Sequence, residues 1–191
     1  MPKWKLLMRF DAAAYGPGAA SILALDGSGE RLMPLARGRC CSEEARTRLR
    51  ASSGESLFRG ARNARAALSG LYLYFSCLDE SHEISQSIKD TDGSFWHAIM
   101  HRQEPDSANA AYWFRRVGRH PIFPALSAGA RAIAAKYPGV RLSFPGEWDP
   151  FAFTDICSSA SGEAEQAARE VQRLEWQLLF DVCARPVTES I

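Results

Sequence analysis

Residues 94–121 read SFWHAIMHRQEPDSANAAYWFRRVGRHP and mix reactive with aromatic side chains more densely than any other part of the 191-residue chain. The stretch holds three of the four histidines, two of the five tryptophans and four arginines. Proline disfavours the α conformation in the residue before it, so Pro105 separates two helices. The first begins near Phe95 with Ser94 as its expected N-cap, and we expect the rest of the chain to be organised around this pair.

One face of the first helix carries two histidines and a carboxylate. His97, His101 and Glu104 are spaced i, i+4 and i+7, which places them within about 60° of one another at 3.6 residues per turn. Such groups can bind a divalent metal ion or move a proton near neutral pH. The residues alone do not separate these chemistries, so all three are candidates for both catalytic and metal-binding roles.

Another candidate ligand lies upstream, on a long helix predicted over residues 61–88. Leu71, Phe75 and Leu78 repeat at i, i+4 and i+7 and form its buried stripe, and the next position of that stripe is His82. A histidine where the period requires an apolar residue needs a hydrogen-bond partner or a metal. His82 is therefore added to the candidate metal ligands.

The segment KDTDGS is expected to join the two helices as an antiparallel hairpin. If the turn is centred between Asp90 and Asp92, the position level with His82 is about residue 100, which His97 and His101 bracket. Three histidines at one height can hold one divalent ion and leave an open coordination position. The alternative is a polar pocket without metal, in which the histidines hydrogen-bond to nearby acidic side chains or to one another.

The next predicted helix runs to Val117, with Asp106 or Ser107 as its candidate N-cap and Gly118 as its stop. Guanidinium groups bind carboxylate or phosphate in bidentate fashion, so the arginines of this region suit a small acidic ligand. Internal salt bridges are the alternative role for them. Asn109 and Trp113 share a helix face and can line the same pocket. The candidate ligand-binding residues are Arg102, Asp106, Asn109, Trp113, Arg115, Arg116 and His120.

The C-terminal third of the chain predicts three more helices. Residues 125–136 form the first. Asp149-Pro150 starts the second, because it places an N-cap before a proline at the first helical position. Ser161 is a candidate cap for the last helix, whose apolar stripe runs to about Ala184. That stripe comprises Ala164, Ala168, Val171, Leu174, Leu178 and Val182.

No stretch shows the period-two alternation of a strand, so the predicted fold is all-α. We expect a single-domain helical bundle of five or six main helices over residues 61–191. Residues 1–60 are turn-rich and irregular, and they predict an N-terminal arm packed on this body.

The composition is that of an ordinary globular protein, with 46% hydrophobic and 24% charged residues and a net charge of +1. This charge gives no case for a nucleic-acid partner, and no apolar run approaches the roughly 18 residues of a membrane span. The five cysteines are odd in number and irregularly spaced, which favours reduced thiols in the cytoplasm over a disulfide framework. We therefore expect a cytoplasmic protein. The arginines described above predict a small anionic ligand as its partner, and the oligomeric state is not predicted.

The run from Trp96 to Pro121 resembles the pattern W-H-x-I-M-H-R-x-E-P-D-x-x-N-A-x-Y-W-F-R-x-V-G-x-H-P of a family of small bacterial and fungal proteins with no assigned activity. An L-D-E-S-H-like segment precedes it, and the resemblance covers about residues 70–124. It implies a shared site rather than a known reaction. A looser likeness is to DinB-like helical metalloproteins, which place one histidine on one helix and H-x-x-x-H on another; here the two helices are adjacent across a tight turn. The matching positions are Asp79, Glu80, His82, Trp96, His97, Met100, His101, Arg102, Glu104, Pro105, Asp106, Asn109, Ala110, Tyr112, Trp113, Phe114, Arg115, Val117, Gly118, His120 and Pro121.

Three functions remain open from the sequence. The first is a small-molecule enzyme, either a metal-dependent hydrolase or a proton-transfer catalyst, that acts on an acidic substrate. The second is a non-catalytic binding module for an anionic small molecule. The third is a structural or interaction protein whose histidines belong to the core.

Overall fold

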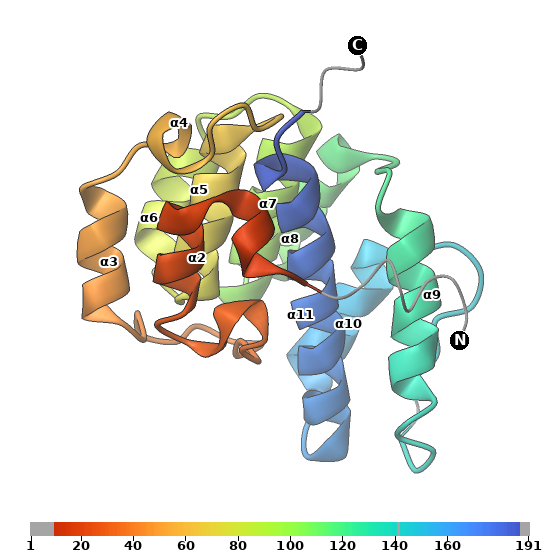
Figure 1. Ribbon diagram of the computed structural model, residues 1–191. Coiled ribbons are helices and arrows are strands. Elements are labelled where there is room, and N and C mark those ends of the chain that lie inside the picture. The colour runs from red at the N-terminus through yellow and green to blue at the C-terminus, as the bar shows by residue number, and fades with distance from the viewer. Residues whose placement is uncertain (1–9, 141, 188–191) are drawn as a thin grey trace.

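The computed structural model, which describes residues 10–140 and 142–187, confirms the all-α fold (Figure 1). Within these ranges the chain forms helices and no strand, and one isolated bridge pairs Ala61 with Pro186. None of the described helices is both long enough and apolar enough to cross a membrane.

After the N-terminal arm the described chain forms seven helices, because the helix predicted over residues 61–88 is divided in two. They are α5 (Ala64–Tyr74), α6 (Leu78–Ser85), α7 (Thr91–Gln103), α8 (Ser107–Val117), α9 (Phe123–Ala134), α10 (Pro150–Ser159) and α11 (Glu163–Ala184). The predicted end of α8 is confirmed, since Gly118, at φ 59°, ends it, and of the two candidate caps Asp106 is the one whose side chain caps the first turn. Asp149 likewise caps α10 as predicted.

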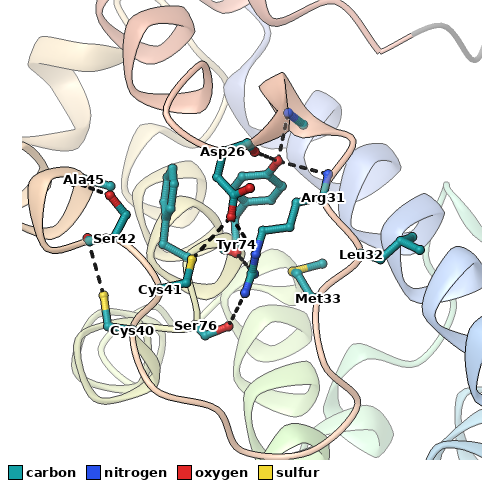
Figure 2. Close-up of polar contacts among 12 residues, drawn as sticks. Asp26, Arg31, Leu32, Met33, Cys40, Cys41, Ser42, Ala45, Tyr74 and Ser76 are labelled. Carbon is teal, nitrogen blue, oxygen red and sulfur yellow. Dashed lines mark hydrogen bonds and ion pairs between the residues drawn. The ribbon is translucent and has the colours of Figure 1, made fainter.

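The division between α5 and α6 is held in place by a residue of the arm. Ser76 has φ 58°, a left-handed conformation that non-glycine residues seldom adopt. The guanidinium of Arg31 donates to the carbonyl oxygen of Tyr74 and, at 3.2 Å, to Ser76 Oγ (Figure 2). The Tyr74 hydroxyl in turn accepts hydrogen bonds from the backbone of Gly29 and Arg31, at 3.0 and 3.1 Å. The arm thus satisfies polar groups that the break in the helix leaves open.

The arm folds into short helices and packs on the main body. Tyr15 donates to Asp181 of α11 at 2.8 Å, and Gln172 of α11 donates to the carbonyl of Pro34 at 3.0 Å. The arm therefore shares the hydrophobic core of the helices that follow it. Its elements are η1 (Ala12–Tyr15), α2 (Pro17–Leu23), η2 (Gly27–Gly29), α3 (Glu43–Arg50) and α4 (Gly54–Leu57).

The long helix α11 packs against α5 as well as against α9 and α10 (Figure 1). Trp176 is fully buried and donates its indole N–H to the carbonyl oxygen of Gly70 at 2.8 Å. A Cβ atom at Gly70 would lie 2.7 Å from the ring of Trp96, so α5 and α7 also approach closely here. These contacts fix α7, the helix that carries two of the candidate histidines.

The sequence placed the start and the buried face of α11 only approximately. Gly162, not Ser161, is the N-cap, and burial extends round much of the helix because it has neighbours on several sides. α9 begins two residues earlier than the predicted 125–136 helix. Of the apolar stripe predicted for α11, Ala168, Val171 and Leu174 are buried, whereas Ala164, Leu178 and Val182 are half-buried.

Two of the five cysteines form a disulfide, so the expectation of reduced thiols is wrong for this pair. Cys40 of the arm is bonded to Cys77, the N-cap residue of α6, with an S–S distance of 2.08 Å. The sequence did not predict this pair, because Cys77 was placed inside one continuous helix. The break at Ser76 instead puts Cys77 next to the arm. Disulfides persist mainly in oxidising compartments, so the cysteines no longer support a cytoplasmic location.

Candidate metal centre

His82 of α6 and His97 and His101 of α7 converge on one site, as expected. Their nearest ligand nitrogens all lie within 4.8 Å of one another. The ring centroids are 4.7 Å apart for His82 and His97, 5.3 Å for His82 and His101, and 4.7 Å for His97 and His101. The two histidines of α7 are buried and His82 is half-buried, so the site opens toward the surface on the α6 side.

The convergence has a different cause from the predicted one. The cap of α7 is Asp90, not Ser94, so the turn is centred near Ile88 and His82 lies level with Ser94. Side chains on a helix tilt toward its N-terminus. In this antiparallel pair His82 therefore leans away from the turn while His97 leans toward it, and the rings meet between the two levels.

The outer nitrogens of the α7 histidines have polar partners. His97 Nδ1 lies 3.0 Å from Ser85 Oγ, within hydrogen-bond distance. His101 Nδ1 lies 3.2 Å from Glu104 Oε2, close enough for an ion pair but without the alignment of a hydrogen bond. The two Nε2 atoms face each other at 3.0 Å. Metal-binding histidines typically donate their second ring N–H to a carboxylate, carbonyl or water in this way. Glu104, also predicted as a metal ligand, is not among the groups that converge here: its carboxylate lies on the Nδ1 side of His101.

An arginine of the arm completes this outer layer. Arg37 places one guanidinium nitrogen 2.7 Å from Glu104 Oε1 and another 2.7 Å from Asp79 Oδ1. The sequence contains no local signal for this contact, because Arg37 is 67 positions from Glu104. Ser85 was also missed, although it lies one turn after His82 at i+3, a spacing that indicates a shared helix face.

Burial keeps the α7 histidines uncharged. Burial is the largest cause, and together with the effects of His101 and His82 it lowers the pKa of His97 to about 3. Burial also lowers the pKa of His101, against the opposing effect of the Glu104 carboxylate. Neutral imidazole is the form that binds a metal, so these two ligands need no proton removed at neutral pH.

Two proton arrangements fit the distances around His97. In the first, Ser85 donates to His97 Nδ1 and His97 Nε2–H donates to His101. In the second, Ser85 donates to the His82 carbonyl, 3.3 Å away, and His97 Nδ1–H donates to Ser85. Both Nε2 lone pairs then face one point, and His101 carries its proton on Nδ1, beside the Glu104 carboxylate. The Ser85 hydroxyl has one hydrogen, so it cannot donate to His97 Nδ1 and to the His82 carbonyl at the same time. The second arrangement needs a cation between the rings, because two Nε2 lone pairs then face each other.

Some of the residues predicted to bind a ligand lie on α8, next to the histidine cluster. The Trp113 ring packs on His97 with centroids 4.2 Å apart, and the Arg116 guanidinium lies 5.3 Å above Trp113. Asn109 shares this face at i−4 from Trp113 and donates to Asp106 at 2.7 Å. Asp106 itself is occupied as the cap of α8.

Three other predicted residues point elsewhere. Arg102 is buried on another face of α7, where it pairs with Glu175 of α11, and its guanidinium lies 4.7 Å from the centre of the Phe153 ring. Arg115 is exposed and lies about 160° from Trp113 around α8. His120 is buried near the start of α7, with Nε2 3.0 Å from Asp92 Oδ1. The structure therefore gives Arg102 and His120 partners inside the protein rather than positions at the centre.

Asp92 gathers three donors at the start of α7. Besides His120 it accepts hydrogen bonds from Asn63, at 3.2 Å, and from Arg62. Burial alone would raise the pKa of Asp92, but these hydrogen bonds and the charge of Arg62 outweigh it and hold the pKa below its ordinary value. The group ties the cap of α5 to the first turn of α7 and to the segment after α8.

No protein family model matches the chain, and neither a curated protein nor a solved structure matches it. The resemblance over residues 70–124 and the likeness to DinB-like metalloproteins therefore remain predictions. The function is inferred from the geometry of the site.

Proposed function

We propose that His82, His97 and His101 bind one divalent metal ion, with zinc best suited to three imidazole ligands. Three protein ligands leave one position of a tetrahedral site for water, which is the arrangement of catalytic rather than structural zinc. Bound zinc lowers the pKa of its water to about 7 and so supplies hydroxide at neutral pH. The activity that follows is metal-dependent hydrolysis of a small anionic substrate.

The observation that carries this proposal is the orientation of the two α7 rings, with each Nδ1 facing an oxygen and each Nε2 facing the other ring. With metal–nitrogen bonds of about 2.0–2.1 Å, two tetrahedral ligands lie about 3.3 Å apart. The 3.0 Å between His97 Nε2 and His101 Nε2 needs an opening of only a few tenths of an ångström. His82, whose ring hydrogen-bonds to none of the described residues, supplies the third nitrogen.

The substrate anion is expected to bind Arg116. This exposed arginine stacks on Trp113, which packs on His97, and it forms no ion pair with an acidic group of residues 10–140 or 142–187. A guanidinium that lacks a carboxylate partner and lies one ring away from the metal ligands can orient a carboxylate or phosphate toward the metal. The α8 face of the centre therefore supplies substrate binding and the α6–α7 pair supplies the metal.

The first test is the metal content of untagged protein purified without chelator. We expect about one zinc per chain after zinc loading, and a visible d–d absorption of four-coordinate geometry after cobalt substitution. His97→Ala and His101→Ala are expected to abolish both signals. Glu83→Ala, an exposed residue beside His82 on α6, and His120→Gln, which removes the one histidine outside the cluster, are the matched controls and should retain them.

Hydrolysis is then measured with 4-nitrophenyl phosphate and 4-nitrophenyl acetate before and after chelation. Turnover that follows metal content and is lost in Arg116→Gln supports the hydrolase. Stoichiometric metal without turnover reduces the proposal to a metal-binding module. Absence of bound metal, together with an unchanged melting temperature on addition of zinc, nickel, cobalt, iron or manganese, would refute the metal centre.

A further inference from the structure

A second cavity, of about 530 Å³, lies beside His120, between α9 and the loop that precedes α10. Its volume is within the range of small-molecule sites, about 300–1,000 Å³. It is distinct from the metal centre, because none of the three clustered histidines lines it. The residues that carry the argument are Arg119, Phe123, Ser127, Arg131 and Trp148.

The wall of this cavity is aromatic and includes an unsatisfied donor. Phe123 is half-buried and Trp148 is 5% exposed. Trp148 is held between Phe144, with ring centroids 5.6 Å apart, and Phe153, at 5.0 Å. Its indole Nε1 is buried and has no hydrogen-bond partner in the described part of the chain. A buried indole N–H usually has an acceptor, so the wall of this cavity contains a donor that the described part of the protein does not satisfy.

The charge of the cavity is positive. Arg119 and Arg131 both line it, and neither lies within ion-pair distance of an acidic group among the described residues. Ser127 Oγ, at 2.7 Å, and the Gly146 carbonyl, at 3.0 Å, fix one nitrogen of Arg131 and leave its other donors for a ligand. Glu147 offsets one of the two charges. The first turn of α9, whose cap residue supplies no side-chain hydrogen bond, adds the positive end of a helix dipole.

We propose that this cavity binds a flat, ring-bearing carboxylate. The ring would lie against Phe123 and Trp148, and the carboxylate would meet the guanidinium groups of Arg119 and Arg131. Aromatic walls with a few converging polar groups are typical of small-molecule sites, and guanidinium binds carboxylate in bidentate fashion. This inference does not depend on metal at the histidine cluster.

The test is calorimetric titration of the full chain with 2-naphthoate and benzoate, with benzamide as the uncharged match of benzoate. We expect at least one carboxylate to bind with a Kd of about 1 mM or tighter, and benzamide to bind at least about tenfold more weakly than benzoate. Arg119→Gln should weaken carboxylate binding about tenfold. Arg115→Gln, an exposed arginine four residues earlier and outside the cavity, should leave it unchanged.

A second readout locates the ligand without relying on an arginine variant. The indole N–H signal of Trp148, assigned as the one lost in Trp148→Phe, should shift on titration with the bound carboxylate. The proposal would be overturned by no binding of either carboxylate with a Kd of about 1 mM or tighter, by equal affinity in Arg119→Gln and Arg115→Gln, or by benzamide binding as tightly as benzoate. Binding that disappears in Arg116→Gln instead would assign the carboxylate to the metal centre and also refute it.

Discussion

Replacement of Arg102 by methionine should destabilise the protein strongly while leaving the histidine cluster intact. The guanidinium and the Glu175 carboxylate are 1% and 0% exposed, and their contacts include NH1 to Oε1 at 3.2 Å. Arg102→Met leaves Glu175 as an uncompensated buried charge. Breaking such a pair costs about 3–5 kcal/mol, which corresponds to a melting temperature lower by roughly 6–20 °C in a chain of this size.

The paired variant Arg102→Met with Glu175→Leu separates charge burial from packing. Replacing a buried ion pair by apolar residues of similar volume is often neutral or stabilising, because neither charge then has to leave water. Gln172, whose side-chain oxygen accepts from Arg102 at 3.2 Å, would lose one partner, at a cost of about 1–3 kcal/mol. We therefore expect the double variant to regain most of the stability that the single variant loses.

Urea denaturation followed by circular dichroism gives the free energies of unfolding, and zinc content reports the histidine cluster. The single variant should bind zinc as the parent does under conditions where both are folded. A loss below about 1 kcal/mol in the single variant, or a double variant no more stable than the single one, would refute the account of this ion pair. Loss of zinc from a folded single variant would show that Arg102 acts on the centre after all.

Three further predictions follow from other contacts. Arg37→Ala should weaken zinc binding about tenfold with little change in stability, because it frees the Glu104 carboxylate that lies beside His101 Nδ1; competition with a zinc chelator measures it. Gly70→Ala should lower the free energy of unfolding by about 1–3 kcal/mol, since the new Cβ would lie 2.7 Å from Trp96; a urea midpoint equal to that of the parent would contradict this. The lowered pKa of Asp92 contributes stability above its unfolded pKa and loses it as pH falls through the folded value. Below about pH 4 the parent should therefore lose stability more steeply than Asp92→Asn in urea midpoints across pH 2–6.

The fold class was predictable because its signals are local. An aspartate before Pro150 and a glycine after Val117 act within one helical turn, so the ends of α10 and α8 could be placed from sequence. The break at Ser76 could not, because Arg31 stabilises it from the arm, 45 positions away. A helix-period pattern continues across that break and carries no sign of it.

The candidate site was predictable in part. The spacing of His97 and His101 placed both rings on one face, whereas the partners of their outer nitrogens depend on how the helices pack. The direction of Arg102 did have a signal: it lies three residues after the buried Ile99 and so extends the apolar face of α7. Glu175, four residues after Val171, extends the buried face of α11 in the same way.

The contact between Arg37 and Glu104 means that the centre depends on the N-terminal arm as well as on the helices that carry its imidazoles. A shortened chain that began at Ala61 would keep every imidazole yet lose the guanidinium that steadies the carboxylate behind one of them. Trimming the first sixty residues would also remove core side chains such as Leu23 and Leu49, so the imidazoles would remain in the sequence without the packing that brings them together.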